Sequence, residues 1–580
     1  MSQHWIKNYP AHVNKALAVP PTTIIDGYRQ SCERNADKQA LISMDVPMTF
    51  RELRRHADCF TSWLQQIGIQ PGDRVALMMP NILAYPVAFF GALQGGYIVV
   101  NVNPLYTPRE LAHQLKDSGA RVLVVLENFA HVVQQVLPQV PVERVVVVAL
   151  GDLLGLKGQL VNLVARHIKK LVPEWHIERH VSFSAVLQTG RKKQPDTVPI
   201  SQADVALLQY TGGTTGISKG AVLTHGNLMA HETIVEEWAR PVFDKIETTD
   251  LVGMAIMPLY HITALMLVLV PSVLRGGRTV LIANPRDLEG LVKTMRRYKV
   301  GMLNGINTLY NALLNHPDIG KVDFSSLMLC GAGGAATQEA VADRWQQLTG
   351  KSICEGFGMS ETSGALTINR IDDTRFRGAA GLPVPLTDIS IRDDEGNVLP
   401  VGEPGEVCAK GPQVMRGYWN RPEETAKAMT ADGYLRTGDI GYFDESGYLH
   451  IVDRKKDMIL VSGFNVFPNE VEEVLAAMPD VLEAAVIGIE DDRSGEAVCA
   501  MVVPRDASLT KEAVMAHCRA NLTPYKCPKI IEFRTSIPKT PVGKILRRAL
   551  REEFKQQRAG SEAGNTGTGT TGTPYQQTGS

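Results

Sequence analysis

The fold is decided by the stretch RVALMMPNILAYPVAFFGALQGGYIVVNVNPLYTPRELAHQLKDSGARVLVVL, residues 74–126. Three apolar runs within it, at 74–80, 97–102 and 121–126, are typical of buried strands, and a fourth, RVVVVAL, follows at 144–150. Helical segments separate the four runs. Because strands that alternate with helices usually pair in parallel, with the helices on the faces of the sheet, the pattern predicts an α/β fold.

The start of one of these helices is marked by Thr107-Pro108-Arg109-Glu110. A threonine three residues before a glutamate can form a capping box, in which each side chain accepts a hydrogen bond from the backbone N–H of the other residue. Proline is favoured at the first helical position, so we expect a helix to begin at Pro108.

The length and charge of the chain limit its organisation and its partners. Its 580 residues exceed what one hydrophobic core normally serves, and 60 lysines and arginines nearly balance 61 aspartates and glutamates. A net charge of −1 gives no electrostatic reason to bind nucleic acid or another large polyanion. We therefore expect two or more domains and small-molecule partners.

The cysteines and the N-terminus are typical of a reduced, cytoplasmic protein. The eight cysteines include no C-x-x-C pair and no metal-ligand spacing, and MSQHWIKNYP lacks the basic and apolar regions of a secretory signal. The most apolar segment, at 253–274, is interrupted by Pro258, His261 and Pro271. We expect it to form buried core and a site loop and not a membrane span.

The character of the sequence changes twice in its second half. From about Thr387 short strands and Gly-rich turns such as DDEGN and DESG become common, and after Lys455 a smaller mixed segment begins. The end, GNTGTGTTGTPYQQTGS, is polar and has no residues to build a core. We expect an N-terminal domain at 1–454, a C-terminal domain at 455–555 and a disordered tail at 556–580.

A glycine-rich loop, YTGGTTGISKG at 210–220, offers the donors that a polyphosphate needs. Glycines let backbone N–H groups approach a ligand closely, while hydroxyls and Lys219 add side-chain donors. The loop is not a Walker P-loop, because two residues separate Gly216 from Lys219 and Gly220 stands where a serine or threonine is needed. Taken alone, such a run is more often a surface turn, so other segments must decide.

Further polar segments supply groups for nucleotide and metal chemistry. GFGMSET, at 356–362, combines glycines with the aromatic face of Phe357 and with Glu361, a carboxylate suited to Mg²⁺. Asp439 follows a glycine in YLRTGDIG, where a carboxylate can accept hydrogen bonds from two ribose hydroxyls. Arg454 and Lys544, the latter in PKTPVGKILRR, add cations. Each residue alone is equally compatible with a turn or a solvated charge.

Together and in this order, these segments resemble the adenylate-forming enzymes, which join acyl, aryl and aminoacyl acids to CoA or carrier thiols and include firefly luciferase. DGYLRTGDIGYFDESGYLHIVDRKK, at 432–456, is similar to the signature segment of fatty acyl-CoA synthetases. Within that family, MTFRELRRHAD, GDRVALMMPN, VNVNPLYTPREL, MPLYHI, GFNVFPNEVE and GKILRRALREE resemble the bacterial long-chain fatty-acid CoA ligases. The resemblance runs from about Trp5 to Phe554.

The resemblance implies a large N-terminal domain with doubly wound, mainly parallel sheets and a small barrel-like β part, followed by a small mobile α+β C-terminal domain. It also implies a reaction in two steps, in which fatty acid and ATP give acyl-AMP and pyrophosphate, and CoA then gives acyl-CoA and AMP. The first step is needed because a carboxylate lacks a good leaving group. ATP, Mg²⁺ and CoA are the implied cofactors, and the family is compatible with a homodimer.

The resemblance also assigns roles to single residues. Lys544 bridges the attacking carboxylate and the α-phosphate, Glu361 holds Mg²⁺, and His261 and Thr214 complete the catalytic set. His261 is otherwise best read as a hydrogen-bonded core histidine. Phe357, where many relatives have tyrosine, stacks on adenine. The implied nucleotide- and CoA-binding residues are Tyr210, Thr211, Gly212, Gly213, Thr214, Thr215, Gly216, Lys219, Gly333, Gly334, Glu355, Gly356, Phe357, Gly358, Ser360, Asp439, Arg454, Gly463 and Phe464.

Two other functions fit parts of the pattern. A ligase that passes the acyl group to a carrier protein would share the first step, although no carrier domain follows the catalytic chain. A non-catalytic regulator would bind ATP without releasing pyrophosphate, which the joint presence of Glu361, Asp439 and Lys544 argues against.

LKGQLVNLVARHIKKLV, at 156–172, predicts an amphipathic helix. Its basic face carries Arg166, Lys169 and Lys170, and its apolar face carries Leu160, Val161, Val164, Ile168, Leu171 and Val172. The apolar face either packs on the protein, as in most such helices, or contacts a membrane surface into which fatty acids partition. In the second alternative, the cytoplasmic protein also makes weak peripheral contact with the inner face of the cytoplasmic membrane.

Overall fold

The computed structural model describes residues 4–211, 218–248, 251–462, 464–491, 494–506, 508–540 and 543–565. It separates into two compact units, Met1–Ile451 and Val452–Ser580. Each unit has its own sheet structure and its own hydrophobic core.

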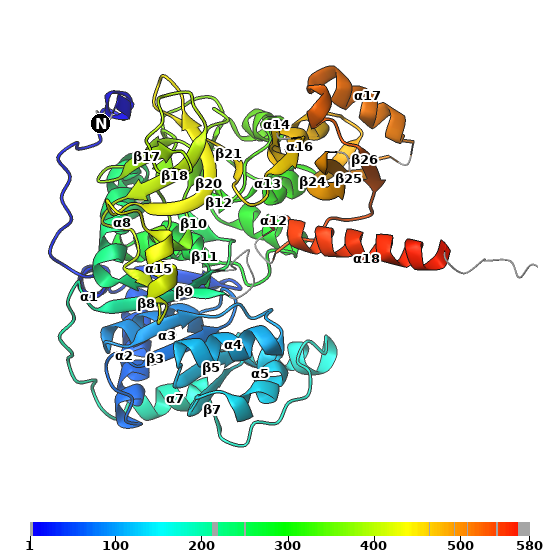
Figure 1. Ribbon diagram of the computed structural model, residues 1–580. Coiled ribbons are helices and arrows are strands. Elements are labelled where there is room, and N and C mark those ends of the chain that lie inside the picture. The colour runs from blue at the N-terminus through cyan, green and yellow to red at the C-terminus, as the bar shows by residue number, and fades with distance from the viewer. Residues whose placement is uncertain are drawn as a thin grey trace, which may run out of the picture. The chain divides into compact units, whose positions relative to one another are not determined.

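The first sheet of the N-terminal unit contains the four predicted strands (Figure 1). They are neighbours in the order β4-β3-β5-β6, and each pair is parallel. Their bounds are β3 (Arg74–Met78), β4 (Ile98–Asn101), β5 (Val122–Leu126) and β6 (Arg144–Val148). The sheet continues through β7 (His180–Ser182) beyond β6, and through β8 (Val205–Thr211), β9 (Lys219–Thr224) and β19 (Gly417–Tyr418) beyond β4.

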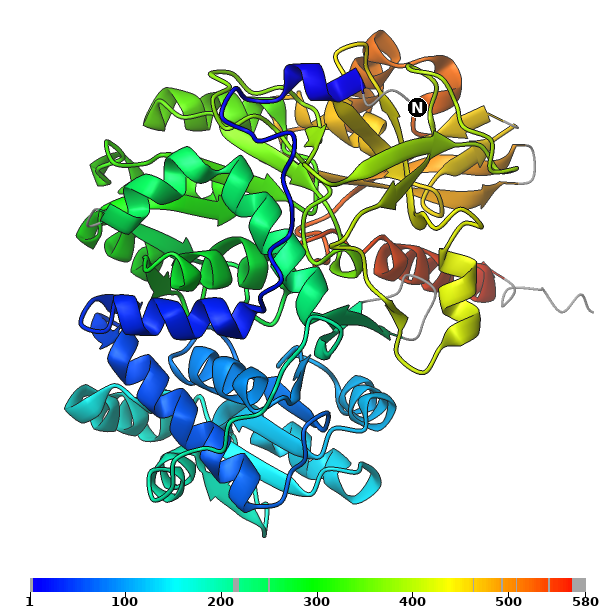
Figure 2. The same ribbon diagram turned by 90° about the vertical axis from the view of Figure 1, so that its left-hand side faces the viewer.

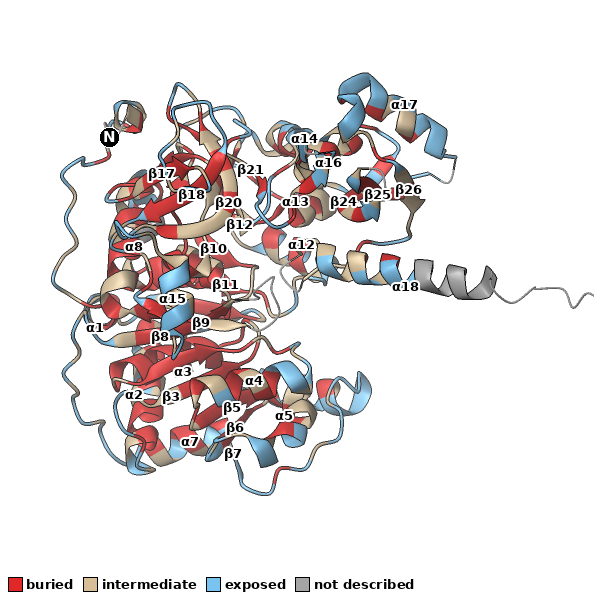
Figure 3. Ribbon diagram, viewed as in Figure 1, coloured by how far each residue is buried: buried red, intermediate tan, exposed pale blue. Residues whose placement is uncertain are grey.

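Helices cover both faces of this sheet, so alternate residues of one strand face different cores. Val75 and Leu77 of β3 belong to one cluster, and Ala76 and Met78 belong to another. Side chains of α2 (Phe50–Gln66), α3 (Ala84–Gln94) and α7 (Phe183–Gly190) fill the first cluster, whereas α4 (Pro108–Ser118) and α5 (Ala130–Val136) fill the second. The predicted doubly wound α/β arrangement is confirmed, and Figure 3 shows its central strands β3 and β5 as buried.

The predicted capping box lies at the start of α4. Glu110 N donates to Thr107 Oγ1 at 3.4 Å, and Thr107 N donates to Glu110 Oε2 at 2.8 Å. The helix begins at Pro108, as predicted, and ends at Ser118, followed by Gly119, whose φ of 62° suits glycine. Local signals therefore set both ends of this helix.

The second sheet of the N-terminal unit has nine strands in the order β16-β15-β14-β13-β12-β10-β11-β1-β2. The strands from β14 to β1 in this order pair in parallel, and the pairs at the two ends are antiparallel. The bounds are β1 (Gln39–Ser43), β2 (Val46–Thr49), β10 (Val252–Ala255), β11 (Arg278–Leu281), β12 (Val300–Gly305), β13 (Leu329–Gly333), β14 (Ile353–Phe357), β15 (Thr367–Ile368) and β16 (Leu382–Pro383).

Helices also pack on both faces of the second sheet. Met302 of β12 faces the cluster that contains α1 (Ile24–Arg34) and α8 (His225–Trp238), whereas Leu303 faces the cluster formed with α12 (Leu288–Arg297), α13 (Asn307–Leu314) and α14 (Glu339–Thr349). Figure 2 shows α1 and α2, in blue, on the near side of the unit.

The apolar segment at 253–274 is buried core, as predicted. It contributes most of β10 and the continuous helical run α10 (Ile262–Ala264), Leu265–Leu269 and α11 (Val270–Leu274). Most of its side chains are buried in the unit's cores. Among the helices in the described ranges, none combines the length and apolar character that crossing a bilayer requires.

A smaller antiparallel sheet completes the N-terminal unit and corresponds to the small β part expected there. Its order is β17-β18-β20-β21. The strands are β17 (Asp388–Arg392), β18 (Gly405–Lys410), β20 (Leu435–Phe443) and β21 (Leu449–Arg454), and β21 crosses the boundary between the units at Ile451.

The C-terminal unit is a small α+β structure. Its sheet has the order β23-β22-β25-β24, with β26 paired to β25. The strands are β22 (Ile459–Val461), β23 (Phe464–Val466), β24 (Val481–Asp491), β25 (Gly495–Pro504) and β26 (Ile530–Phe533), and the helices are α16 (Pro468–Ala476), α17 (Lys511–Asn521) and α18 (Arg547–Asn565). Residues 556–565 of the tail expected to be disordered belong to α18, and residues 566–580 lie outside the described residues.

Candidate nucleotide site

The predicted phosphate loop connects two paired strands. β8 ends at Thr211 and β9 begins at Lys219, and these two residues are antiparallel partners. Gly212, Gly213, Thr214, Thr215 and Gly216 lie between them, outside the described residues. The strand pair therefore brings the two ends of the loop side by side.

The hydroxyl of Tyr210, one residue before the end of β8, is held by α4. It donates to Asp117 Oδ2 at 2.8 Å, and Asp117 Oδ1 accepts from Arg421 at 2.7 Å. Burial, reinforced by Asp117, raises the pKa of Tyr210 well above its usual value, so the phenol stays protonated. Tyr210 thus ties the start of the loop to the helix that the capping box begins.

Lys219 holds a carboxylate in this structure. Its ammonium forms an ion pair with Glu424 of α15 (Pro422–Ala428) and lies 5.3 Å from the ring centroid of Tyr418. Hydrogen bonding to Lys219, and then to Lys427, lowers the pKa of Glu424. The ammonium of Lys219 thus binds a carboxylate anion at the end of the predicted phosphate loop.

Glu361 lies in the short helical turn Ser360–Thr362, which packs against β8 and β9. Its side chain is buried, and Oε1 accepts a hydrogen bond from the hydroxyl of Tyr418 at 2.9 Å. Its backbone carbonyl accepts from Met415 N at 2.7 Å. Two of the predicted elements, the loop ends and the acidic turn, are thus brought together.

The residues after Glu361 are anchored by side chains that sequence reasoning missed. Ser363 Oγ donates to Gln413 O at 2.9 Å, and Ala365 N donates to His231 Nε2 at 3.0 Å. Burial lowers the pKa of His231 to about 3, so the imidazole is neutral and can accept this bond. Ser363 and Gly364 have φ of 56° and 136°, which allows the sharp turn between Glu361 and β15.

The chemistry of this site suits Mg²⁺ bound together with a polyphosphate. Within the described ranges, no three His, Cys, Asp or Glu side chains gather as a possible ion-binding group. Mg²⁺ commonly uses one or two carboxylates, with phosphate and water oxygens as its other ligands. The buried Glu361 carboxylate beside a cationic loop end matches that pattern, so the residues fit the implied ion.

Small residues line the neighbouring ends of β13 and β14. Gly333 and Gly356 are partners in this parallel pair, and a Cβ on Gly333 would lie 3.0 Å from Gly356 O. Gly334 has a φ of 84°, and a Cβ on Gly358 would lie 1.7 Å from Gly364 O. The glycines at 333, 334 and 358 are therefore needed for the backbone itself, whether or not a ligand approaches.

Glu355 stabilises the loop that follows β13. Its Oε1 accepts from Thr337 N at 2.8 Å, and burial raises the pKa of this carboxyl to about 7.

Phe357, two residues after Glu355, is half-buried and packs on the core of the small β part. Asp439, on β20, is buried, and its N–H donates to Thr437 Oγ1 at 3.2 Å.

A buried polar network, which sequence reasoning also missed, supports the turn at His261. Tyr85 donates to Asn101 Oδ1 at 2.7 Å, Asn101 donates to Gln209 Oε1 at 3.0 Å, and Gln209 donates to Tyr260 O at 3.0 Å. Asn101 ends β4, where ligand sites of parallel sheets gather, and this position could have identified it. His261 follows directly and is half-buried.

Lys544 belongs to the C-terminal unit, and its backbone is hydrogen-bonded to Thr540. Thr540 N donates to Lys544 O at 2.7 Å, Lys544 N donates to Thr540 Oγ1 at 3.0 Å, and Gly543 has a φ of 80°. In the same unit, Phe464 is exposed and stacks on Tyr525 with centroids 5.0 Å apart, while Gly463 lies outside the described residues.

Asp453 is also part of the C-terminal unit and has a fully buried side chain. Its carboxylate accepts from Asn469 N at 2.9 Å and from Arg454 N at 2.7 Å, and lies 3.9 Å from the guanidinium of Arg547. Arg454 itself is exposed at the end of β21. The backbone before Lys456 is therefore attached to α16 and α18 of this unit.

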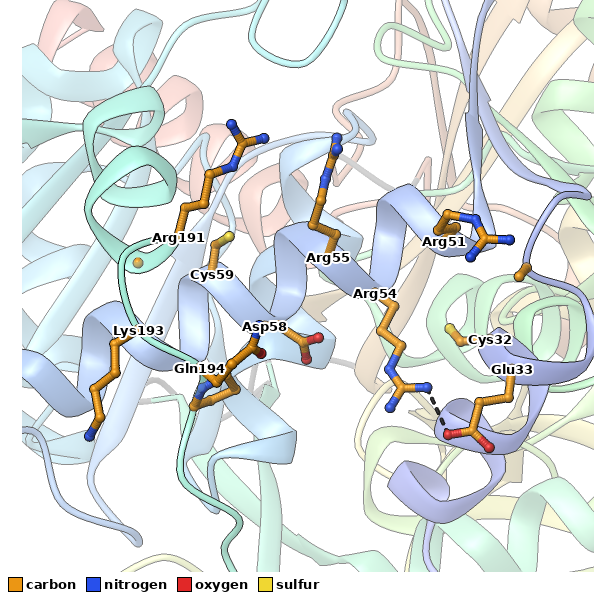
Figure 4. A pocket seen from close by; sticks show the side chains of 13 residues that line it. Cys32, Glu33, Arg51, Arg54, Arg55, Asp58, Cys59, Arg191, Lys193 and Gln194 are labelled. Atoms are coloured by element: carbon orange, nitrogen blue, oxygen red, sulfur yellow. Dashed lines mark hydrogen bonds and ion pairs between the residues drawn. The ribbon is translucent and has the colours of Figure 1, made fainter.

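A separate surface hollow of about 510 Å³ is lined by α1, α2 and the residues after α7 (Figure 4). Three of the five cations in its lining form ion pairs, since Arg51 contacts Asp37 at 2.8 Å, Arg54 contacts Glu33 at 2.8 Å and Lys193 contacts Asp196 at 2.9 Å. Its lining includes no residue of the predicted nucleotide site.

Comparison with protein families matches both units. A family described as AMP-binding enzyme matches residues 28–419, and one described as AMP-binding enzyme C-terminal domain matches residues 470–544. The chain is 50% identical over 556 residues to a long-chain-fatty-acid–CoA ligase of Yersinia pestis, covering 95% of this chain and 98% of the relative. It is 48% identical over 561 residues to the ligase of that name from Escherichia coli O6:H1, covering 96% and 99%.

Solved structures show the same fold. An anthranilate CoA ligase in complex with anthranoyl-AMP matches with a TM-score of 0.82 and 28% identity, covering 94% of this chain and 99% of that one. ATP-bound MatB from Rhodopseudomonas palustris matches with a TM-score of 0.76 and 27% identity, covering 92% and 100%.

Proposed function

The chain belongs to the AMP-binding enzyme family, and from this we propose that it is an ATP-dependent ligase that converts long-chain fatty acids into acyl-CoA thioesters. The observation that carries the proposal is the 50% identity, over 95% of the chain, to a long-chain-fatty-acid–CoA ligase. The buried carboxylate and the cationic loop end in the N-terminal unit supply groups that MgATP requires.

In the proposed first step, a carboxylate oxygen of the fatty acid attacks the α-phosphorus of ATP, and the bond to the β-phosphate oxygen breaks to release pyrophosphate. Thr211, Lys219 and the loop between them bind the departing phosphates, while Asp439 binds the ribose. Glu361 would hold Mg²⁺, which supplies charge neutralisation between the phosphates when bound. Lys544 places an ammonium where the two anionic reactants meet.

In the proposed second step, the thiol of CoA loses its proton and its sulfur attacks the acyl carbon, and the carbon–oxygen bond to AMP breaks. Phe357 holds the adenine, and His261 lies beside the acyl carboxylate. Arg454 contacts the ribose or phosphate region, while Gly463 and Phe464 approach the pantetheine arm. Exposure of Phe464 is compatible with a role in contacting a ligand.

The proposal is tested by measuring pyrophosphate release across a series of acids from acetate to long-chain fatty acids, followed by thioester formation with CoA. We expect release to require an acid and to be strongest with long chains, and the thioester to form with CoA. Release without a CoA thioester would favour transfer to a carrier protein. ATP binding without acid-dependent release would identify a regulator and overturn the proposal.

We also propose that α6 (Gly155–Leu163) and the residues after it contact an anionic membrane surface. The exposed fractions are 86% for Leu156, 63% for Leu160, 51% for Leu163, 68% for Ile168 and 50% for Leu171. These apolar side chains therefore face outward, which is the opposite of an ordinary helix that packs its apolar side on the protein.

The inward side of this segment combines the small buried residues Gly158 and Ala165 with the half-buried Val161 and Asn162. A Cβ on Gly158 would lie 2.0 Å from Gly151 O, and Asn162 Oδ1 accepts from Gly151 N at 2.6 Å. Arg166 is exposed, but it pairs with the buried Glu127 at 2.7 Å, so the protein already engages this member of the basic face expected from the sequence. Lys169 and Lys170 remain exposed beside the leucines. Outward leucines with lysines match the apolar and anionic layers of a bilayer.

Replacing Lys169 and Lys170 by glutamine is expected to weaken binding to vesicles of anionic phospholipid about tenfold or more, because each lysine contributes about 1 kcal/mol near such a surface. Replacing Leu156 and Leu160 by glutamine should abolish co-sedimentation. The matched control replaces Val398 and Val401, two exposed valines of the small β part, by glutamine and should leave binding unchanged. A parent protein that fails to sediment with these vesicles at low salt would contradict the proposal.

A further inference from the structure

Tyr418 connects the two groups that the proposed ATP site needs in fixed positions. It lies on the edge strand β19, where Gly417 and Tyr418 pair with Val222 and Ala221 of β9. Trp419 N also donates to Gly220 O at 2.8 Å. The backbone of Tyr418 is thus fixed to the strand that begins at Lys219.

A second attachment fixes Tyr418 from the other side. Its N–H donates to Thr425 Oγ1 of α15 at 2.8 Å. α15 also carries Glu424, the partner of Lys219. The main chain at Tyr418 is therefore held between β9 and α15, and its side chain projects from a rigid support.

The side chain touches both functional groups. The hydroxyl donates to Glu361 Oε1 at 2.9 Å, and the ring centroid lies 5.3 Å from the ammonium of Lys219. A phenol is uncharged at neutral pH and its O–H is a donor, whereas an ionised carboxylate only accepts, so the hydroxyl of Tyr418 donates in this contact. A neutral donor on one carboxylate oxygen orients the carboxylate without neutralising it.

We propose that Tyr418 is a positioning residue, which orients the Glu361 carboxylate for Mg²⁺ through its hydroxyl and holds the Lys219 ammonium for the phosphates through its ring. The inference rests on the proposed ATP-dependent function. It predicts two separable effects. The hydroxyl should strengthen the Mg²⁺-dependent part of ATP binding, and the ring should strengthen ATP binding with or without Mg²⁺.

The test measures ATP binding by calorimetry in saturating Mg²⁺ and in EDTA. Tyr418→Phe removes only the hydroxyl, and losing a group that orients a metal-binding carboxylate typically lowers metal affinity 10- to 100-fold. We expect the Mg²⁺ concentration that half-saturates binding to rise about tenfold or more, with affinity in EDTA unchanged. Tyr418→Leu should additionally weaken binding in EDTA, because it removes the ring under Lys219.

Tyr434 provides a matched control. Its hydroxyl donates to Asp388 Oδ2 at 2.6 Å, and its ring lies 4.6 Å from the guanidinium of Arg392, so it repeats the same hydroxyl–carboxylate and ring–cation contacts within the small β sheet. Tyr434→Phe should leave the Mg²⁺ dependence unchanged. A matching thermal unfolding midpoint for the two phenylalanine variants shows that an effect is local.

The outcomes separate this inference from the proposed function. Parental Mg²⁺ dependence in Tyr418→Phe, or an equal loss of binding in Mg²⁺ and in EDTA, would overturn the positioning role while leaving the function intact. A parent protein that binds no ATP under either condition would overturn both. A selective shift in Mg²⁺ dependence, absent from Tyr434→Phe, would support the inference.

Discussion

Lys544→Ala is expected to lower the rate of acyl-AMP formation about 100- to 1000-fold, which is the usual cost of removing one group that stabilises charge in a transition state. The carboxylate and the α-phosphate are both anionic, and an ammonium between them offsets their repulsion as they approach. Thioester formation from supplied acyl-AMP should proceed near the parental rate, because the phosphorus–oxygen bond is then already made.

The two half-reactions are measured separately, by pyrophosphate release and by thioester formation from synthetic acyl-AMP and CoA. Lys511→Ala, which removes an exposed ammonium from the same unit, is the matched control and should behave as the parent. Lys544→Arg keeps the positive charge but replaces the ammonium by a planar guanidinium, so it shows whether the rate depends on the charge alone or also on the shape of the cation. An equal fall of both half-reactions in folded Lys544→Ala would show that the assigned role is wrong.

Lys456→Pro is expected to have the opposite effect on the two half-reactions: acyl-AMP formation should persist and thioester formation should fall. Lys544 must be near the α-phosphate in the first step, and a thiol must later reach the same acyl carbon. The resemblance to adenylate-forming enzymes, in which the C-terminal domain moves between the two steps, aligns Lys456 with their hinge residue, so we propose that the chain after Lys456 changes position about this residue. A hinge absorbs a change of φ and ψ at few residues, and proline fixes φ near −65° and restricts the residue before it.

We expect the first turnover of acid-dependent pyrophosphate release to persist in Lys456→Pro, while acyl-CoA formation falls by about 100-fold, as for a misplaced reacting group. A single-turnover experiment is needed, because trapped acyl-AMP would slow later cycles. Lys456→Ala is the control, since it removes the charge but keeps the backbone free. Parental thioester formation by a folded Lys456→Pro protein would exclude a hinge at this residue.

Much of the fold could be predicted because its signals are local. The four predicted strands of the first sheet are buried on both faces, so their apolar runs stand out, and the capping box at Thr107 marks a helix start within four residues. The family was also predicted, and the family comparison confirms it. The order of residue types along the chain was sufficient to predict both these local elements and the family.

Contacts between distant segments could not be predicted in the same way. The periodicity of α6 shows which side chains share a face, but Gly151 and Glu127 decide which face is inward. Tyr418 meets Glu361 from a strand of two residues, which carries no periodic signal. Sequence order identified the candidate groups of the site, whereas the hydrogen bonds that orient them depend on tertiary packing.

The buried carboxylate of Asp453 would add an energy barrier to the proposed motion. If the chain rotates about Lys456, Asp453 must leave Asn469 N and Arg547, because these partners lie beyond the pivot. A charged pair that loses one partner in a dry interior is costly, so intermediate angles are disfavoured until water or a new donor replaces the lost contacts. The segment would then be stable in two arrangements, and the rate of exchange between them would depend on how fast the Asp453 side chain leaves its partners.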